Sequence, residues 1–212
     1  IVTWTSTANT SHTFGHGLGV APQMVIVKRR SSSGVWRIGH TSLGWTTALQ
    51  FDTGASLAAD GAYWNNTAPT STVVSIGDTG QLGADNVAYC FAPVVGYSSF
   101  GSYTGNGSSD GPFVYTGFRP KWVMVKETGN SNNWFLLDAV RSTYNYVGDT
   151  LWPNLSNQEN DTSINPNTTY NNFDYLSNGF KLRSGYSGTN RSSGTYIYCA
   201  FAESPFNYAR AR

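Results

Sequence analysis

Three oxygen-bearing side chains alternate in the segment "NQENDT", namely Asn157, Glu159 and Asp161. Amide and carboxylate oxygens spaced two residues apart are ligands that Ca²⁺ takes in loops. The segment lacks the glycine and the closing bidentate glutamate that complete an EF-hand loop. Two interpretations therefore stay open, a solvated loop without metal and a weak Ca²⁺ site. We expect no other cofactor.

A second kind of chemistry, the binding of sugar rings, is indicated where aromatic residues stand beside asparagine in loops. Ligand sites combine aromatic walls, which stack on apolar ring faces, with a few polar groups that fix orientation. Two segments have this composition, "AYWNNT" (62–67) and "LWPNLSNQENDTSINPNTTYNNFDY" (151–175). The competing interpretation is that the aromatic rings are core and the asparagines are turn residues. The candidate glycan-binding residues are Trp64, Asn65, Asn66, Trp152, Asn154, Asp174 and Tyr175.

Patterns for catalysis are sparse. A glycosidase uses two nearby carboxyl groups as acid and nucleophile or base, whereas the 12 Asp and Glu residues here are spread thinly. The three histidines, His12, His16 and His40, all lie in the first half of the chain. Thr116 and Asp138 match His16 and His40 in the second half, so the repeat itself has no metal or catalytic role for histidine. We expect a binding protein rather than an enzyme.

The strands that must position these loops occur in two similar copies along the sequence. "GVAPQMVIVKRR" (19–30) returns as "GFRPKWVMVKET" (117–128), and "NVAYCFAPV" (86–94) returns as "TYIYCAFAES" (195–204). Apolar, β-branched runs bounded by proline, glycine and serine are typical of core strands. No segment sustains a helical period beyond a short turn. The sequence predicts an all-β, jelly-roll-like two-sheet β-sandwich built from an internal duplication.

The duplication leaves the domain count open. We expect one domain over residues 1–212, with halves at about 12–100 and 112–206, because one repeat alone is small for a sandwich. The alternative is two small β domains that split near 101–112. The lysine that follows each repeated strand, Lys28 or Lys126, is expected at the solvent end of its strand.

Composition excludes several classes of protein. Only 12% of residues are charged, the net charge is +1, and aromatic residues reach 15%. A chain with so many aromatic residues and so little charge is folded rather than disordered. A nucleic-acid surface needs clustered cations, and a membrane span needs a long apolar run, so we expect neither nucleic-acid binding nor membrane insertion. Cys90 and Cys199 are either two thiols or one disulfide.

Five phrases resemble a known module over most of the chain, from His12 to Phe206. It is a module of tail-fibre and other virion proteins of bacteriophages, notably those of marine bacteria and cyanobacteria. The resemblance implies a concanavalin A-like or laminin G-like jelly roll near the end of a fibre, on the surface of the virion, in a homotrimer. It carries over no catalytic or binding residues. The phrases are "HGLGVAPQMVIVKRR", "AYWNNTAPTSTVVSIG", "VAYCFAPVVGYSSFGSYTGNGSSDGPFVYTGFRPKWVMVK", "LSNGFKLR" and "GTYIYCAFAESPF".

The residues and the resemblance together predict a receptor-binding, lectin-like domain of a phage fibre or virion appendage. It would bind a bacterial cell-surface polysaccharide without cleaving it. The first alternative is a structural or assembly module of the capsid or tail, with its aromatic residues at subunit interfaces. The second is a polysaccharide depolymerase, which requires a carboxylate pair that converges in a groove.

Overall fold

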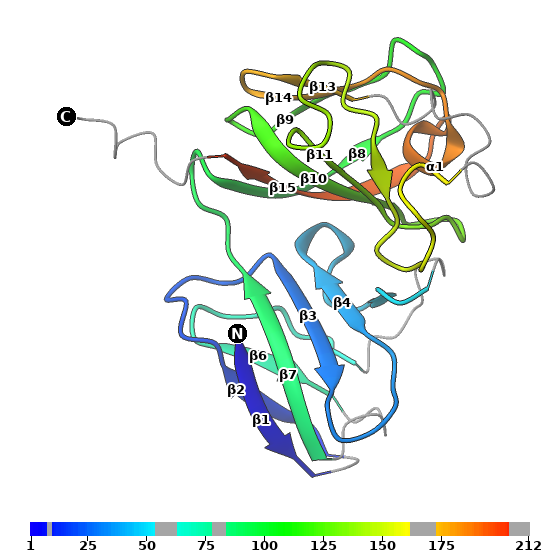
Figure 1. The fold of residues 1–212 in the computed structure, drawn as a ribbon. Helices are drawn as coiled ribbons and strands as arrows, with labels where there is room; N and C mark the ends of the chain where they lie inside the picture. Colours follow the sequence, from blue (N-terminus) through cyan, green and yellow to red (C-terminus); the bar gives the residue numbers. More distant parts are fainter. Residues whose placement is uncertain (8–9, 54–62, 78–83, 162–172, 204–212) are drawn as a thin grey trace. The chain divides into compact units, whose positions relative to one another are not determined.

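The computed structural model describes residues 1–7, 10–53, 63–77, 84–161 and 173–203. Within these ranges the chain is almost entirely β, and every strand pair is antiparallel (Figure 1). It divides into two compact units, unit 1 (Ile1–Pro93) and unit 2 (Val94–Arg212). The sheets form a sandwich-like arrangement, which confirms the predicted fold class.

Unit 1 has a five-stranded sheet of order β1-β7-β3-β4-β5 and a two-stranded sheet of β2 and β6. The runs rich in valine and isoleucine form its central strands, as β-branched side chains favour. The elements are β1 (Val2–Ser6), β2 (His12–Gly15), β3 (Met24–Arg29), β4 (Arg37–His40), a 3₁₀ turn (Thr41–Leu43), β5 (Leu49–Gln50), β6 (Val73–Ile76) and β7 (Ala84–Phe91).

In the part of the chain that the structure describes, unit 2 repeats this plan with one added strand, β13. Its larger sheet has the order β12-β11-β10-β15-β8, and its smaller sheet has the order β13-β14-β9. The elements are β8 (Ser98–Thr104), β9 (Phe113–Tyr115), β10 (Pro120–Glu127), β11 (Phe135–Asp138), β12 (Thr150–Leu151), β13 (Phe173–Leu176), β14 (Gly179–Leu182), α1 (Ser187–Asn190) and β15 (Thr195–Ala202).

The duplication seen in the sequence is therefore a duplication of strand order and register. In unit 1 Met24 of β3 pairs with His40 of β4, and in unit 2 the matching residues Trp122 and Asp138 form the same pair. The correspondence extends to the edge strand, because β1 and β8 occupy the same place in the two larger sheets. Residues 1–6 thus belong to the first repeat, although their sequence does not reveal it.

Each unit has a core between its two sheets. In unit 1 Phe14 and Val74 of the smaller sheet join Val25 and Val27 of the larger one. In unit 2 Val114 and Phe180 join Val123, Val125 and their neighbours. In each unit, the larger and the smaller sheet thus bury one face against each other, as the alternation of side chains along strands allows.

Lys126 corrects one expectation. Its side chain is fully buried, and its Nζ donates to the carbonyl oxygens of Glu127 (2.6 Å) and Asn130 (3.2 Å). Burial lowers the Lys126 pKa to about 8, against the opposing effect of the Glu127 carboxylate. Lys28 is partly exposed and lies over the Trp36 ring, 5.8 Å from its centroid. The repeated lysine is therefore not a solvent-end residue in both copies.

The strands of each sheet come from one unit only. The boundary between the units falls between Pro93 and Val94, ahead of β8. That the two halves make a single domain stays a prediction. Cys90 and Cys199 are free thiols. In the part of the chain that the structure describes, no helix is long and apolar enough to cross a membrane.

Candidate functional site

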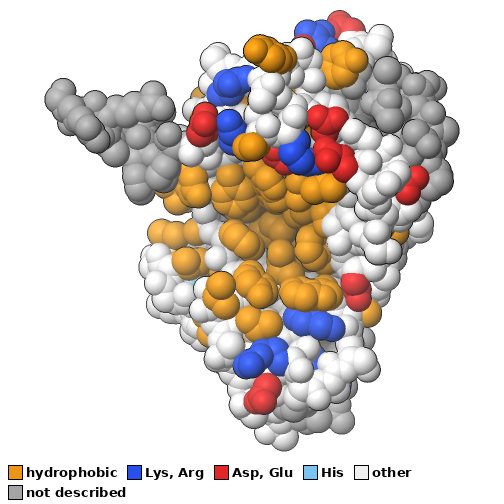
Figure 2. Space-filling model, in the orientation of Figure 1, with side chains coloured by type: hydrophobic (Ala, Val, Ile, Leu, Met, Phe, Trp, Pro, Cys, Tyr) orange, Lys and Arg blue, Asp and Glu red, His pale blue; other side chains and the backbone are white. Residues whose placement is uncertain are grey.

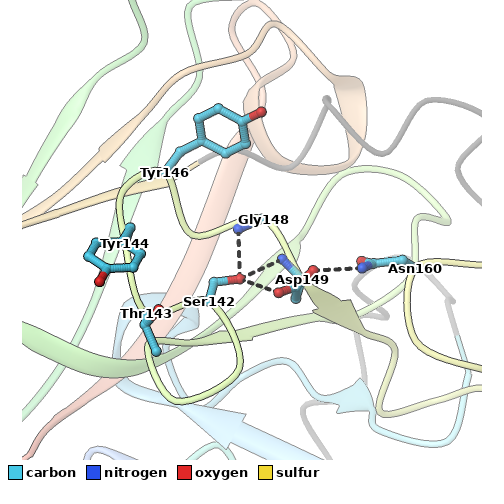
Figure 3. A pocket seen from close by; sticks show the side chains of 7 residues that line it. All are labelled: Ser142, Thr143, Tyr144, Tyr146, Gly148, Asp149 and Asn160. Carbon is cyan, nitrogen blue, oxygen red and sulfur yellow. Dashed lines mark hydrogen bonds between the residues drawn. The ribbon is translucent and has the colours of Figure 1, made fainter.

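The loop from β11 to β12 in unit 2 forms a surface depression of about 410 Å³ (Figure 3). We call it the tyrosine site. Its polar atoms lie at the base of the loop, and two tyrosine rings project from the loop's middle. The site is lined by Ser142, Thr143, Tyr144, Tyr146, Gly148, Asp149 and Asn160.

A row of hydrogen bonds joins Ser142, Asp149 and Asn160. The Ser142 hydroxyl donates to Asp149 Oδ2 (2.6 Å), and Asn160 Nδ2 donates to Asp149 Oδ1 (2.7 Å). Asn160 Oδ1 in turn accepts the backbone N–H of Thr150 (2.8 Å). The hydrogen bonds from Ser142 and Asn160 hold the Asp149 pKa below its usual value. Hydroxyl, carboxylate and amide are thus fixed in position before any ligand arrives.

The two tyrosine rings lie largely in solvent, with 85% of Tyr144 and 53% of Tyr146 exposed. The residue between them, Asn145, ties the loop to strand β13. Its Nδ2 donates to the Tyr175 carbonyl oxygen (3.1 Å), and its Oδ1 accepts the Tyr175 N–H (3.0 Å). Val147 adds a β-bridge to Phe173. The rings are therefore presented by an anchored backbone.

Arg141 brings two carboxylates together next to this loop. Its Nε donates to Asp138 Oδ2 (2.6 Å), and its Nη1 donates to Glu159 Oε1 (2.8 Å). Burial raises the Asp138 pKa, but hydrogen bonds from the Arg141 backbone and side chain and from the Val140 N–H outweigh it, so the pKa is lowered. A glycosidase needs one carboxyl group with a raised pKa as its acid. The shifts at Asp138 and Asp149 run in the opposite direction.

Trp64, the first predicted sugar platform, is a core residue. It is fully buried, with its ring edge-on to Trp45 (5.2 Å between centroids) and Tyr63 (4.9 Å). Gly39 makes the room, since a Cβ there would lie 2.3 Å from Trp45 and 2.8 Å from Trp64. No ring face is available for stacking, so this assignment is corrected. The exposed Asn65 and Asn66 have φ angles of 51° and 47°, the turn role that asparagine tolerates.

The second set of predicted residues makes contacts within unit 2. Trp152 and Tyr175 are buried in the unit 2 core, and Tyr175 Oη donates to the Leu137 carbonyl oxygen (2.9 Å). Asp174 forms an ion pair with Arg183 (2.5 Å). Asn154 Oδ1 accepts the Trp134 N–H (2.9 Å), as the Asp52 carboxylate accepts the Trp36 N–H (3.3 Å) in unit 1.

The alternating acidic segment does not converge on one point. Asn157 Nδ2 donates to Asp161 Oδ2 (2.8 Å), whereas Glu159 pairs with Arg141. Among the described residues, no group of three or more His, Cys, Asp or Glu side chains is arranged to hold a metal ion.

The histidines show structural contacts. His16 and His40 are buried, with His16 Nε2 3.1 Å from the Thr70 carbonyl oxygen and His40 Nδ1 accepting the Ser42 N–H (3.2 Å). His12 accepts the Trp4 indole N–H at Nε2 (2.9 Å).

Sequence reasoning missed Ser142, Tyr144, Tyr146 and Asp149. The signal was present in "RSTYNYVGD" (141–149), where two tyrosines stand in a polar loop with serine and aspartate. Asn160 lies in the segment that composition had singled out.

The sequence also contains one serine motif. Gly107–Gly111 ("GSSDG") has the G-x-S-x-G spacing, but it leads into strand β9. A nucleophile elbow needs a strand-to-helix turn.

Comparison with known proteins gives one result. A search of curated proteins and a search of solved structures found no match to the chain. A family model does match, over residues 1–205, and its description is a domain of unknown function, DUF7483. Since the match covers nearly the whole chain, the protein belongs to the DUF7483 family.

Proposed function

We propose that this protein is a carbohydrate-binding module that holds a bacterial surface polysaccharide at the tyrosine site without cleaving it. The observation that carries the proposal is the pair of exposed rings, Tyr144 and Tyr146, beside the fixed row of Ser142, Asp149 and Asn160. Aromatic rings next to a few preorganised polar groups are the composition that ligand sites use. An anchored loop also loses little conformational entropy when it binds.

The charges suit a sugar better than a phosphate-rich partner. In the view of Figure 2, Lys and Arg side chains lie beside Asp and Glu, and no large field of one sign is drawn. At the tyrosine site the charged lining residue is Asp149, whose lowered pKa keeps it ionised near neutral pH. A carboxylate accepts hydrogen bonds from ligand hydroxyls and repels phosphate.

The state of the neighbouring acids supports binding without cleavage. Asp138 accepts hydrogen bonds from Val140 and Arg141, and Asp149 accepts them from Ser142 and Asn160. These contacts favour the ionised form of both groups. A retaining or inverting hydrolase would need one of its two carboxyl groups protonated.

The biological setting is proposed from the sequence resemblance alone. It is the surface of a phage particle, where this chain would form part of a homotrimeric fibre or appendage. Proposed binding involves no metal, so it should survive a chelator.

The second candidate function is an assembly module. Val140, Tyr144 and Tyr146 expose 67%, 85% and 53% of their surface within one loop. Aromatic side chains are enriched at subunit interfaces. If that loop is covered by a second copy, its tyrosines become buried in the oligomer instead of contacting sugar.

The deciding experiment compares the wild-type chain with the double variant Tyr144→Ala/Tyr146→Ala on a glycan array and on whole bacterial cells, with the solution mass recorded. Tyr115→Ala is the matched control, since Tyr115 is 66% exposed in the same unit and lies outside the site. The proposal requires that the double variant lose binding at least tenfold, that Tyr115→Ala keep it, and that the bound polysaccharide keep its length. Equal binding by all three chains removes the site. Loss of oligomer mass in the double variant favours assembly.

A further inference from the structure

We propose that a groove in unit 1, between strands β1 and β2, is a second carbohydrate site that takes a neutral sugar residue. The groove has a volume of about 520 Å³, within the usual range of ligand pockets. The inference rests on the proposed function, because it assigns the same class of ligand to the other unit. We call it the Trp4 groove. It is lined by Val2, Thr3, Trp4, Thr5, Ser6, Thr7, Thr10, His12, Thr13, Phe14 and Gly15.

Trp4 offers the groove an apolar ring rather than a hydrogen-bond donor. Its Nε1–H already donates to His12 Nε2 (2.9 Å), and His12 Nδ1 lies 3.0 Å from the Thr10 carbonyl oxygen. These contacts fit a neutral imidazole with its proton on Nδ1. Phe14 stacks on one face of the indole at 4.2 Å between centroids. The ring is only partly buried, so its remaining surface is open to a ligand.

The rest of the lining indicates the charge and chemistry of that ligand. None of the residues that line the groove is Asp, Glu, Lys or Arg. Threonine and serine instead make up most of the lining, and a hydroxyl both donates and accepts hydrogen bonds. Two of these hydroxyls already donate within the unit, that of Thr5 to Asp85 Oδ1 (2.9 Å) and that of Thr10 to the Thr7 carbonyl oxygen (3.0 Å). A ligand that carries hydroxyls of its own, with no net charge, matches such a wall. An apolar C–H face on the same ligand would stack on the Trp4 indole.

Unit 2 shows that the same place can be closed by the protein itself. Tyr103 of β8 corresponds to Trp4 of β1, since each lies across from the matching position of the neighbouring strand. Tyr103 is only 8% exposed, and its Oη donates to the Thr189 carbonyl oxygen of α1 (2.7 Å). The neighbouring Asn190 is held by the β8–β9 connection, through Ser108 O (2.9 Å).

The segments that connect the strands at this edge have different lengths in the two units. The connection from β1 to β2 spans residues 7–11, whereas the one from β8 to β9 spans residues 105–112. The segment before the last strand is shorter too, residues 77–83 against 183–194. At this edge the described residues of the two copies differ, because Tyr103 is covered in unit 2 whereas Trp4 keeps part of its surface exposed in unit 1.

The test follows the indole N–H signals of the ¹⁵N-labelled full chain by NMR. Trp4→Phe identifies the Trp4 signal, and Trp36, also partly buried in unit 1, is the internal control. The probes are the methyl glycosides of glucose, galactose, mannose and N-acetylglucosamine, with glucuronic acid as the charged comparison. We expect at least one neutral glycoside to move the Trp4 signal saturably and leave Trp36 in place. The inference is overturned if no neutral glycoside moves Trp4 or if glucuronic acid moves it equally.

A second variant guards against a change in fold. Thr10→Val removes one exposed hydroxyl of the lining, next to His12, and keeps a β-branched side chain. We expect it to weaken the Trp4 titration about tenfold with an unchanged unfolding midpoint, and an unchanged titration contradicts the assignment. Each of the two proposals can be refuted without refuting the other. The Tyr144→Ala/Tyr146→Ala variant should keep the Trp4 titration, and an unmoved Trp4 signal leaves the adsorption test of the tyrosine site intact.

Discussion

Ser142 and Asp149 hold each other by two hydrogen bonds. The Ser142 hydroxyl donates to Asp149 Oδ2 (2.6 Å), and the Asp149 backbone N–H donates to Ser142 Oγ (3.1 Å). The Gly148 N–H reaches the same oxygen (3.3 Å). This pair closes the base of the loop that carries Tyr144 and Tyr146, so the two rings project from a fixed frame.

Ser142→Ala should therefore loosen the loop. Loss of the Ser142 hydroxyl leaves two backbone N–H groups without the oxygen that they bind, and it removes a hydrogen-bond donor to Asp149. We expect a loss of about 1–3 kcal/mol in the free energy of unfolding, measured with urea, together with weaker adsorption to cells. Thr143→Ala, at the exposed neighbouring position, is the control for the measurement of stability. Equal stability of the two variants would mean that the Ser142 contacts do not order the loop.

Acid should destabilise the protein through Asp138 and Asp149. The pKa of each is lowered in the folded state, so the unfolded chain binds protons more readily. Their contribution is complete above the unfolded value of about 4 and is lost as pH falls through the lower, folded values. The urea midpoint should drop in that window, and the drop should be shallower in Asp149→Asn. Parallel curves for wild type and variant would refute the role of Asp149.

The buried Glu127 should depend on Arg191. Glu127 is fully buried, and its Oε1 accepts Arg191 Nε and Nη2 (2.7 Å each) and Asn130 Nδ2 (2.8 Å). Arg191→Met leaves the carboxylate with fewer donors. We expect a cost of about 2–3 kcal/mol, below the 3–5 kcal/mol of fully enclosed pairs because the Arg191 side chain is 43% exposed.

A double-mutant cycle with Glu127→Gln checks the cause of that cost. Glu127→Gln removes the charge and keeps the shape, so Arg191→Met should cost less in that background. If Arg191→Met costs the same in both backgrounds, the ion pair does not contribute.

The repeated strands were predictable because their signal is local. Apolar, β-branched runs after Pro22 and Pro120 became β3 and β10, with matching partners on both sides. The equivalence of β1 and β8 was not visible. Edge strands have a single partner each, and the residues at this edge, such as Trp4 and Tyr103, are free to differ.

The two cysteines show that a shift of one residue in the alignment of the repeats changes the sheet face on which a side chain lies. Cys90 pairs with Val25 of β3, but Cys199 pairs with Met124 of β10, which matches Ile26 and not Val25. Because side chains alternate along a strand, a shift of one residue puts the two sulfurs on opposite sheet faces. Cys90 packs against the unit 1 core. The similar phrases "AYCFA" and "IYCAFA" conceal this shift.

The site was harder to predict because exposure is decided by distant residues. Trp64, which lies in a turn, is buried since Gly39 of strand β4 leaves room for two indoles. Tyr144 and Tyr146 are exposed since Asn145 fixes the loop to β13. In each case a residue at least 25 positions away is involved, Gly39 for Trp64 and Tyr175 for Asn145, so composition alone does not show which aromatic rings are exposed.

Trp64→Ala should consequently act on stability. Emptying a fully enclosed indole site costs about 3–5 kcal/mol, and the urea midpoint should fall accordingly. Trp64→Phe, which fills part of the space, should cost less. Asn66→Gly at the exposed turn is the control, since glycine also adopts a positive φ. A stable, well-folded Trp64→Ala chain would contradict the core position of this residue.

The thiols should differ in reactivity with a disulfide reagent such as DTNB. Burial raises the Cys90 pKa to about 11 and raises that of the fully buried Cys199 further. The reactive thiolate of Cys90 is therefore about a hundredfold scarcer than in a free thiol near neutral pH. We expect Cys90 to react slowly in the native protein, Cys199 more slowly still, and both quickly in urea. In the Cys90→Ala variant only Cys199 can react, so its reaction rate is measured alone. If Cys199 in that variant reacts as fast as Cys90 does in the wild type, its sulfur is not shielded by the fold.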